Sequence, residues 1–337
     1  MRVLIPTPLT HLPLIAEIIG TRHEIVSAPG TSEADLVAAV ADADAFVATG
    51  MDVTPAVLAA GARLQVVGTP QVGVDRIDLA AATDAGIPVI SSQGLAATAV
   101  AEFALGLMLS LSRRIAQSDR DLRGPAHWSS RPTYAEPTMR LGREVRGSTV
   151  GIAGLGMIGA ETARLAAAFG CRVLGYDPVV SAEDMAARGA EKREDMVALA
   201  REVDFLVLHV PLIPATRHLV DTEVLAAMRS TAFVINVSRG GVVDEAALLD
   251  ALAQGRIAGA ALDVFEDEPL ADDSPLLAAD GLILTPHIAG VTHEWNAQRS
   301  RAFAERLLQV LDGERPAGLA NPDVWAAFEA RRERLVR

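Results

Sequence analysis

The feature that most constrains this chain is a glycine-rich segment between an apolar run and a helix-like stretch. The run Val150–Ala153 is followed by Gly154-x-Gly156-x-x-Gly159, and Ala160–Phe169 then has helical character. In a strand–turn–helix unit the first glycine permits a tight turn, the second lets the backbone approach a pyrophosphate, and the third lets the helix pack closely on the strand. The segment therefore predicts a parallel α/β domain that binds a dinucleotide at a helix N-terminus, where free N–H groups attract phosphate.

An acidic residue, Asp177, follows directly on the next strand-like run, Arg172–Tyr176. A carboxylate at this place accepts hydrogen bonds from the adenosine ribose hydroxyls and repels the additional phosphate of NADP. We therefore expect NAD as the cofactor, with Met157 and Ile158 beside it at the start of the helix. The alternative is a glycine turn in an α/β domain that binds nothing, with Asp177 capping a helix.

Strand-like and helix-like segments alternate along the chain, which favours parallel sheets covered by helices on both faces. The length of 337 residues favours two domains. The strand-like runs of the first half are Arg2–Ile5, Glu24–Ser27, Ala45–Ala48, Gln65–Gly68 and Val89–Ser91; those of the second are Thr149–Gly154, Arg172–Tyr176, Phe205–Val210, Ala232–Val237, Gly259–Val264 and Leu282–Thr285.

The two halves are joined by a long helix and an irregular connection. The helix is expected at about Ala97–Ser118, and the final helix of the chain at about Trp295–Leu311. Residues 123–146 show no periodicity, which is typical of a functional lid or of an ordinary surface loop. In the first case Trp128, Arg131 and Tyr134 are candidates to contact the substrate.

The composition excludes several classes of partner. A formal net charge of −13 repels nucleic-acid phosphates and anionic lipid, so neither is expected to bind. The single cysteine, Cys171, cannot form an intrachain disulfide, which fits a reducing compartment. The N-terminus lacks the pattern of a signal peptide, and the most apolar stretch, Ala96–Leu111, contains Glu102 and is shorter than the ~20 residues of a membrane span. We expect a soluble cytoplasmic protein.

Three short motifs at the ends of strand-like runs carry the candidate catalytic residues, Arg239, Glu268 and His287. In a doubly wound sheet the carboxyl ends of the strands line the ligand site. A guanidinium such as that of Arg239 holds a carboxylate through two hydrogen bonds. A histidine titrates near neutral pH and so suits proton transfer to a carbonyl oxygen, while a nearby carboxylate stabilises the imidazolium and fixes its orientation. Together they predict hydride transfer to a 2-keto acid.

Each of these residues also has a structural interpretation. Arg239 is then a surface or helix-capping cation, Glu268 one of several solvated acids in its loop, and His287 a loop histidine with satisfied hydrogen bonds. Other histidines compete for the catalytic role: His209, which we expect to border the cofactor, and His218, His293 and His127, which we interpret as surface or lid residues. No pair of histidines has convincing metal-ligand spacing, and we expect no metal.

The motifs together resemble those of the D-isomer-specific 2-hydroxyacid dehydrogenases, the family of phosphoglycerate dehydrogenase and of the glyoxylate and hydroxypyruvate reductases. The resemblance covers nearly the whole chain. It rests on the following segments: Val72-Gly73-Val74-Asp75, Val100-Ala101-Glu102, Gly147–Ile152, His209-Val210-Pro211-Leu212, Ser238–Glu245, Gly259–Phe265 and Pro286-His287-Ile288-Ala289-Gly290.

This resemblance implies two doubly wound parallel-sheet α/β domains with a crevice between them. Residues 1–96 and 290–337 would form a flavodoxin-like substrate domain, and residues 97–289 a Rossmann NAD domain. It implies that Arg239 anchors the substrate, Glu268 orients His287, and His287 is the acid–base group. Backbone groups of Val72 and Gly73 would hold the substrate carboxylate, Asp263 the nicotinamide carboxamide, and a homodimer would form through the NAD domain. Further cofactor contacts are expected at His209, Val210, Pro211, Val237, Ser238 and Gly290.

Departures from the family pattern leave the substrate open. Gln93 stands where many members have proline, and Ala96 where a polar residue is common. A glyoxylate- or hydroxypyruvate-like acid is favoured over formate or phosphite, and because the chain ends soon after Trp325 we expect no appended regulatory domain. The rival hypothesis is a dinucleotide-sensing corepressor on the same fold, which would contain the same three residues.

Overall fold

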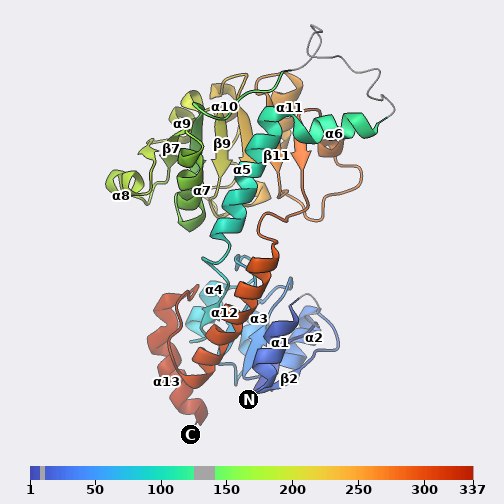
Figure 1. The fold of residues 1–337 in the computed structure, drawn as a ribbon. Coiled ribbons are helices and arrows are strands. Elements are labelled where there is room, and N and C mark those ends of the chain that lie inside the picture. The colour runs from blue at the N-terminus through green and yellow to red at the C-terminus, as the bar shows by residue number, and fades with distance from the viewer. Residues whose placement is uncertain (8–11, 125–140, 337) are drawn as a thin grey trace. The chain divides into compact units, whose positions relative to one another are not determined.

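The computed structural model describes residues 1–7, 12–124 and 141–336, and the chain divides into two compact units (Figure 1). Unit 1 consists of Met1–Ala96 and Val291–Arg337, and unit 2 of Ala97–Gly290. Gly290, which the sequence analysis placed with the C-terminal segment, falls in unit 2. The candidate lid residues Trp128, Arg131 and Tyr134 lie outside the described residues.

Unit 1 contains a five-stranded sheet in which all neighbouring strands are parallel. The order β2-β1-β3-β4-β5 is that of the flavodoxin-like fold, as predicted, with its switch point between β1 and β3. The predicted strands are confirmed to within two residues at each end: β1 (Arg2–Leu4), β2 (Glu24–Val26), β3 (Ala45–Val47), β4 (Val66–Gly68) and β5 (Val89–Ile90).

Helices cover both faces of this sheet. One apolar cluster joins the sheet to α1 (Pro13–Gly20), α12 (His293–Asp312) and α13 (Trp325–Val336), and another joins it to α2 (Glu33–Val40), α3 (Pro55–Ala60) and α4 (Leu79–Asp84). The prediction that the chain's last helix is the one now seen as α12 was wrong, because α13 follows it. Its few apolar residues, such as Trp325 and Phe328, are followed by a run of charge, so the sequence shows no clear helical face.

A buried amide fastens the C-terminal segment to the edge of the sheet. Asn321 Oδ1 accepts a hydrogen bond from Val89 N at 2.8 Å, and its Nδ2 donates to Ile87 O and to Thr83 Oγ1, both at 3.1 Å. Asn321 is 7% exposed. Its side chain therefore supplies the hydrogen bonds that the outer strand β5 would otherwise lack on its free side.

Unit 2 contains a seven-stranded parallel sheet with the order β12-β11-β10-β9-β6-β7-β8. This is the Rossmann order extended by one strand, with the switch point between β6 and β9. The strands are β6 (Thr149–Ala153), β7 (Arg172–Tyr176), β8 (Glu191–Lys192), β9 (Phe205–Leu208), β10 (Phe233–Asn236), β11 (Gly259–Leu262) and β12 (Leu282–Leu284). The sequence did not predict β8, because it is a two-residue edge strand made of charged residues.

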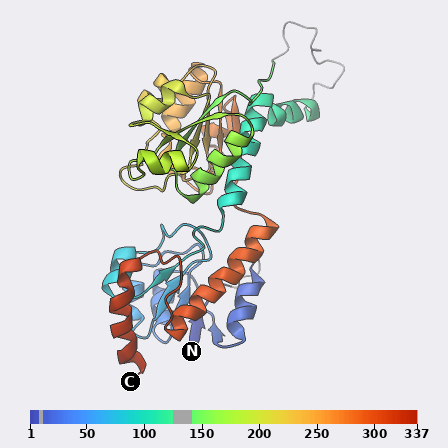
Figure 2. The same ribbon diagram turned by 60° about the vertical axis from the view of Figure 1, so that its left-hand side comes forward.

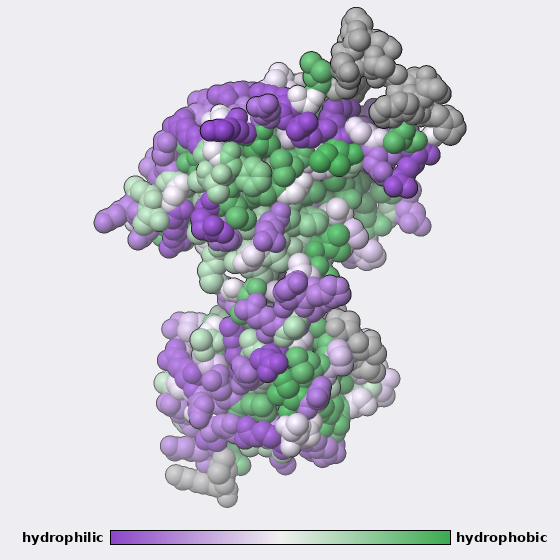
Figure 3. Space-filling model, viewed as in Figure 1, coloured by the Kyte–Doolittle hydropathy of each residue, from purple (hydrophilic) through white to green (hydrophobic). Residues whose placement is uncertain are grey.

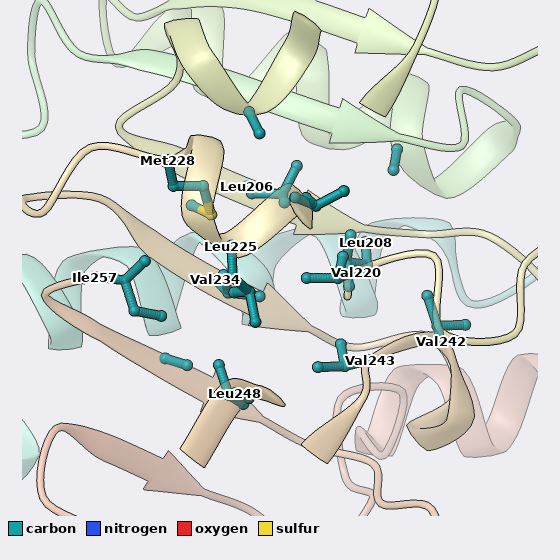
Figure 4. Close-up of a cluster of buried hydrophobic side chains, with 14 of the residues drawn as sticks. Leu206, Leu208, Val220, Leu225, Met228, Val234, Val242, Val243, Leu248 and Ile257 are labelled. Carbon is teal, nitrogen blue, oxygen red and sulfur yellow. The ribbon is translucent and has the colours of Figure 1, made fainter. Parts of the chain in front are cut away.

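The sheet of unit 2 lies between two helical layers. On one face α5 (Ala97–Arg113) and α7 (Met157–Ala168) pack against each other and against β6, β10 and β11. On the other, α9 (Met196–Glu202), α10 (Thr222–Ala227) and α11 (Glu245–Ala253) close over an apolar cluster, which includes Leu206, Leu225, Val234 and Leu248 (Figure 4). Strands buried on both faces explain their nearly continuous apolar sequences.

The single long helix predicted at Ala97–Ser118 was wrong. The helix α5 ends at Arg113, Arg114 adopts a left-handed conformation with φ of 57°, and α6 (Ile115–Arg123) runs at an angle to α5 (Figure 1 and Figure 2). The carbonyl of Ser112 accepts a hydrogen bond from Arg143 N at 2.8 Å. This bond comes from a segment distant in sequence, so apolar periodicity could not reveal the break. Within the described ranges no helix is both long and apolar enough to span a membrane.

Candidate active site

The glycine loop joins β6 to α7 at the switch point of unit 2. A Cβ on Gly154 (φ 89°) would lie 2.8 Å from the backbone C and O of His209, and a Cβ on Gly159 would lie 2.0 Å from Gly154 O. A Cβ on Gly156 would meet nothing within 4 Å. Two of the glycines are thus required by close backbone packing, whereas the side of Gly156 is open to an approaching ligand.

The N-terminus of α7 is available to an anion. Gly156 is the N-cap residue and provides no side-chain hydrogen bond, and Met157 and Ile158 form the first turn of a 12-residue helix. The first N–H groups of a helix have no partner within it and carry a positive partial charge. The open backbone beside Gly156 and these N–H groups together fit a pyrophosphate.

The structure places Asp177 beside the same loop, half-buried at the end of β7. Its Oδ2 accepts a hydrogen bond from Leu155 N at 2.9 Å, and its Oδ1 accepts one from Val179 N at 3.1 Å. The N-cap of the next helix, α8 (Ala182–Ala187), is Ser181, so Asp177 does not cap a helix. Each carboxylate oxygen can accept a second hydrogen bond, which leaves room for ribose hydroxyls.

His209 follows β9 and attaches it to α7. Its Nε2 lies 2.9 Å from Thr162 Oγ1, whose own hydrogen is donated to Ile158 O at 3.0 Å, so Nε2 is the donor. Part of the residue is accessible, but its Nδ1 is buried without a partner, and burial lowers the pKa of His209 to about 3. A histidine that stays neutral is a poor proton donor. The predicted contacts of His209, Val210 and Pro211 with a dinucleotide stay predictions.

The turn after β10 presents Arg239. Fully buried Asn236 organises it: its Oδ1 accepts hydrogen bonds from N and Oγ of Ser238 at 3.0 and 2.8 Å, and its Nδ2 donates to Arg239 O at 2.9 Å. Arg239 Nη1 donates to Ser238 O at 2.7 Å. Val237 and Ser238 are buried in this turn. The sequence motif did not predict this role of Asn236, because a hydrogen bond from a side chain to a neighbouring turn is not visible in a motif.

The turn that carries Arg239 packs tightly on the loop that carries Glu268. A Cβ on Gly240 would lie 1.8 Å from the backbone C and O of Phe265, so only glycine fits there. Glu268 Oε1 accepts a hydrogen bond from Phe265 N at 3.1 Å. The carboxylate is therefore held by its own loop.

His287 and Glu268 form a pair across two neighbouring strand ends. Glu268 Oε2 lies 2.8 Å from His287 Nδ1. The side chains are 36% and 51% exposed, respectively, so the pair is open to a substrate-sized molecule. His287 itself adopts a left-handed conformation with φ of 54°, and its N–H donates to Asp263 O at 2.8 Å. A non-glycine residue in this conformation is uncommon and indicates that the surrounding loop determines it.

Asp263, immediately after β11, is the residue that determines this loop. Its side chain is completely buried; Oδ1 accepts hydrogen bonds from Thr285 Oγ1 at 2.6 Å and Ile288 N at 2.9 Å, and Oδ2 accepts one from Ala289 N at 2.8 Å. The sequence analysis missed this positioning role and the part of Thr285 in it. Oδ2 keeps one lone pair for the predicted carboxamide contact. Gly290 ends the same loop.

The remaining candidates lie apart from this pair. His218, with φ of 52°, has Nε2 3.0 Å from Glu266 Oε1, on the outer side of the acidic loop. His293 is exposed in the first turn of α12, and His127 lies outside the described residues. Val72 and Gly73 occupy the loop after β4 of unit 1, and their participation stays a prediction.

The chain is similar to known proteins over most of its length. Residues 105–289 match the family model for the D-isomer specific 2-hydroxyacid dehydrogenase NAD binding domain. A glyoxylate reductase of Korarchaeum cryptofilum is 40% identical over 290 residues, 86% of each chain. A D-3-phosphoglycerate dehydrogenase of Methanocaldococcus jannaschii is 38% identical over 323 residues, and the match covers 95% of this chain but only 59% of that protein.

Solved structures show the same fold. The NADPH-dependent glyoxylate/hydroxypyruvate reductase of Sinorhizobium meliloti, in complex with NADP and malonate, is 30% identical with a TM-score of 0.83, and the match covers 96% of this chain and 97% of that one. The family domain matches more than half of this chain, and the glyoxylate reductase is matched over most of its length. This chain therefore belongs to the D-isomer specific 2-hydroxyacid dehydrogenase family.

Proposed function

We propose that this chain is an NAD-dependent enzyme that moves a hydride between the nicotinamide and the α-carbon of a small D-2-hydroxy or 2-keto acid. The observation that carries the proposal is the pair formed by His287 Nδ1 and Glu268 Oε2 at 2.8 Å. Glu268 follows β11 and His287 follows β12, and β11 neighbours β10, which precedes Arg239. An open histidine backed by a carboxylate is the arrangement expected of an acid–base group.

In the proposed reaction Arg239 holds the substrate carboxylate, so that the neighbouring carbonyl oxygen lies beside His287. When bound, the nicotinamide supplies the hydride that adds to the carbonyl carbon. His287 gives the proton from Nε2 to the oxygen as negative charge develops there, and in the opposite direction it takes the hydroxyl proton. Glu268 keeps Nδ1 as a hydrogen-bond donor and stabilises the imidazolium.

The cofactor-binding residues in this proposal all lie in unit 2. The open approach at Gly156 and the uncapped N-terminus of α7 hold the pyrophosphate. Asp177 accepts the ribose hydroxyls. The loop of Asp263 and Ala289 borders the nicotinamide, and the free lone pair of Asp263 accepts from its carboxamide.

The preference for NAD over NADP depends on Asp177, since a carboxylate repels the additional phosphate. We expect the KM for NADPH to exceed that for NADH, and Asp177→Ser to reduce the difference by lowering the KM for NADPH. Steady-state kinetics with both cofactors measure this. A wild-type protein that prefers NADPH would overturn the role given to Asp177 without touching the acid–base proposal.

In unit 1, the proposal assigns backbone groups of Val72 and Gly73, after β4, to the substrate carboxylate. The substrates we favour are glyoxylate- and hydroxypyruvate-like acids. The preference rests on the sequence resemblance and agrees with the printed names of the archaeal and Sinorhizobium relatives.

The test follows NADH absorbance with a panel of 2-keto acids, from glyoxylate through hydroxypyruvate and pyruvate to branched and aromatic acids. We expect turnover with at least one acid, and His287→Gln to lower kcat about 10²–10⁴-fold, the contribution of a positioned acid–base group. The matched control is His293→Gln, which changes an exposed histidine six residues later and should leave kcat unchanged. Silence across the panel while NADH still binds would overturn the proposed reaction.

We further propose a homodimer formed through unit 2. The nine-residue helix α6 buries none of its residues, and its Ile115 and Leu122 are 56% and 47% exposed. Figure 3 shows hydrophobic residues on the face of unit 2 where α5 and α7 run in Figure 1. Light scattering should give twice the chain mass. Ile115→Glu together with Leu122→Glu should shift it to the monomer, and a monomeric wild type would disprove the interface.

A further inference from the structure

Unit 1 contains a buried arginine whose charge is unpaired within the described ranges of the chain. Arg299, on α12, is 8% exposed, yet no described residue gives its guanidinium a hydrogen bond or an ion pair. Its contact is with the ring of Trp295, whose centroid lies 3.8 Å from Arg299 Cζ. Other buried or half-buried arginines of the same unit are satisfied: Arg306 donates to Ser91 O, and Arg331 donates to four backbone carbonyls.

Burial without a counter-charge has an electrostatic consequence. Removing a guanidinium from water disfavours its charged form, and burial lowers the pKa of Arg299 to about 10. The group still carries its charge at neutral pH. A buried charge is normally paired, because an unpaired one is costly. Nε of Arg299 and the indole Nε1 of Trp295 are both buried donors without acceptors. Neither donor has an acceptor within the part of the chain that the structure describes, and a positive charge beside free donors suits an anion.

The position of Arg299 relates it to the carboxyl edge of the unit 1 sheet. A Cβ on Gly68, the last residue of β4, would lie 2.8 Å from the ring of Phe303, so α12 packs at that point on the end of β4. Arg299 lies four residues earlier and so on the same face, one turn nearer the helix N-terminus.

The N-terminus of α12 lies at the carboxyl edge of the unit 1 sheet. The strand β5 ends at Ile90, six residues before the chain leaves unit 1 at Ala96, and α12 begins with His293, just after the chain returns at Val291. The carboxyl end of β5 and the N-terminus of α12 are therefore at the same end of unit 1. In open parallel sheets ligands bind outside the carboxyl ends of the strands. The loop with Val72 and Gly73 leaves β4 at this edge.

We propose that Arg299, stacked on Trp295, binds a second anionic group on the substrate, so that among 2-keto and 2-hydroxy acids this enzyme prefers those whose side chain ends in a carboxylate or a phosphate over their uncharged counterparts. The inference rests on the proposed function and names its substrate class. The indole ring fixes the plane of the guanidinium, which then presents its remaining N–H groups in the geometry that carboxylates and phosphates match.

The kinetic test uses two matched substrate pairs, each differing only in the second anion. Hydroxypyruvate is compared with its 3-phosphate ester, and pyruvate with oxaloacetate. We expect the doubly charged member of at least one pair to have the lower KM, and the better pair shows whether phosphate or carboxylate is the natural group. Arg299→Met should raise that KM about 10–100-fold, the strength of a hydrogen bond to a charged group, and leave the singly charged member unchanged.

Control variants separate recognition from folding. Arg301→Met removes an exposed arginine two residues along α12 and should change neither KM. Arg299→Lys keeps the charge but not the planar geometry and should recover part of the preference. If Arg299→Met weakens both members of a pair equally, or if the wild type shows no preference in either pair, the inference is wrong.

A binding test decides the matter if no keto acid is turned over, an outcome that would disprove the proposed function alone. The melting temperature of the protein is measured with malonate and with inorganic phosphate, each against chloride at equal ionic strength. We expect at least one of these anions to stabilise the wild type more than Arg299→Met. An equal shift in both proteins would place the anion elsewhere, at Arg239 for example, and overturn the inference, as would no shift at all.

Discussion

The polar side chains at the carboxyl edges of the two sheets differ in whether they have hydrogen-bond partners. In unit 2 the key groups are joined to one another: Glu268 to His287 at 2.8 Å, and buried Asp263 to three donors of the His287 loop. In unit 1, Arg299 is as deeply buried as a core residue but has no hydrogen-bond acceptor among the described residues.

The roles proposed above for His287 and Arg299 account for this difference. An acid–base group must be in position before the reaction, because reorganising it would add to the barrier. Unit 2 therefore holds its pair with buried hydrogen bonds. A residue that selects a charged ligand has the opposite requirement. It should have no ion-pair partner in the free protein, because an arginine already paired with a carboxylate has neither free N–H groups nor unpaired charge with which to bind the ligand.

The largest effect is expected from breaking the network of unit 2 at Asp263. Asp263→Ala leaves Ile288 N, Ala289 N and the Thr285 hydroxyl without their acceptor, which should cost at least about 3 kcal/mol of the free energy of unfolding. It also releases the His287 loop, so kcat should fall about 10²–10⁴-fold. Denaturant unfolding and NADH kinetics measure the two effects. Thr285→Val removes one donor and should have a small effect on both the free energy of unfolding and kcat. If Asp263→Ala had native-like stability and kcat, the conformation of the His287 loop would not depend on Asp263.

The next largest effect is expected from Gly159 in the glycine loop, and Gly156 in the same loop provides the control. Gly159→Ala places a Cβ 2.0 Å from Gly154 O, and this overlap should cost about 1–3 kcal/mol of stability and abolish NADH binding. Gly156→Ala meets no protein atom within 4 Å, so the protein should fold normally but bind NADH more weakly. Calorimetric titration with NADH checks both. Normal binding by Gly156→Ala would mean that the cofactor does not approach there.

The buried side chain of Asn321 in unit 1 should affect the stability of the fold but not catalysis. Asn321→Ala removes an acceptor for Val89 N and a donor to Ile87 O, and we expect a loss of about 1–3 kcal/mol. Because the amide is bonded to backbone rather than to a ligand site, kcat should not change. The comparison with Asp263→Ala is therefore informative. We expect Asn321 to contribute only to stability, and Asp263 to contribute to both stability and catalysis. A fall in kcat for Asn321→Ala would erase that distinction.

The smallest effect is a pH dependence set by His209. Its pKa in the folded protein, about 3, is below its value of about 6.5 in the unfolded chain. Between these values only the unfolded chain takes up the proton, so stability present above pH 6.5 is lost as the pH falls, by at most about 1.4 kcal/mol per pH unit. His209→Gln keeps a donor to Thr162 and should flatten this slope in urea melts at pH 7, 6 and 5.

The corresponding histidine of unit 1 serves as the reference. The pKa of His23 is also lowered, first by burial and then by the nearby positive charges of the N-terminus and Arg22, but the shift is smaller than that of His209. The variant His23→Gln should therefore flatten the slope less than His209→Gln does. Equal slopes in the wild type and His209→Gln would show that the ring of His209 is protonated without unfolding.

Much of the architecture could be predicted because apolar runs buried on both faces mark parallel strands directly. The unpredicted parts share a physical cause. The strand β8 is too short and polar to leave a pattern, the break at Arg114 is made by a left-handed residue inside a continuous helical pattern, and the positioning roles of Asn236 and Asp263 depend on hydrogen bonds to loops brought close by folding. The periodicity of apolar residues indicates which face of a helix or strand is buried, but it does not reveal short polar strands, left-handed residues or hydrogen bonds between distant segments.

The sequence by itself determined the two-sheet α/β class, the dinucleotide loop and the types of residue at the strand ends, because these follow from local spacing and chain direction. Only the tertiary structure decided what surrounds each residue. His209 and His287 both follow strands, but burial keeps the first neutral beneath the glycine loop, whereas Glu268 reaches the second in an open position. The charge state of a side chain depends on solvent and neighbours, and those neighbours are distant in sequence.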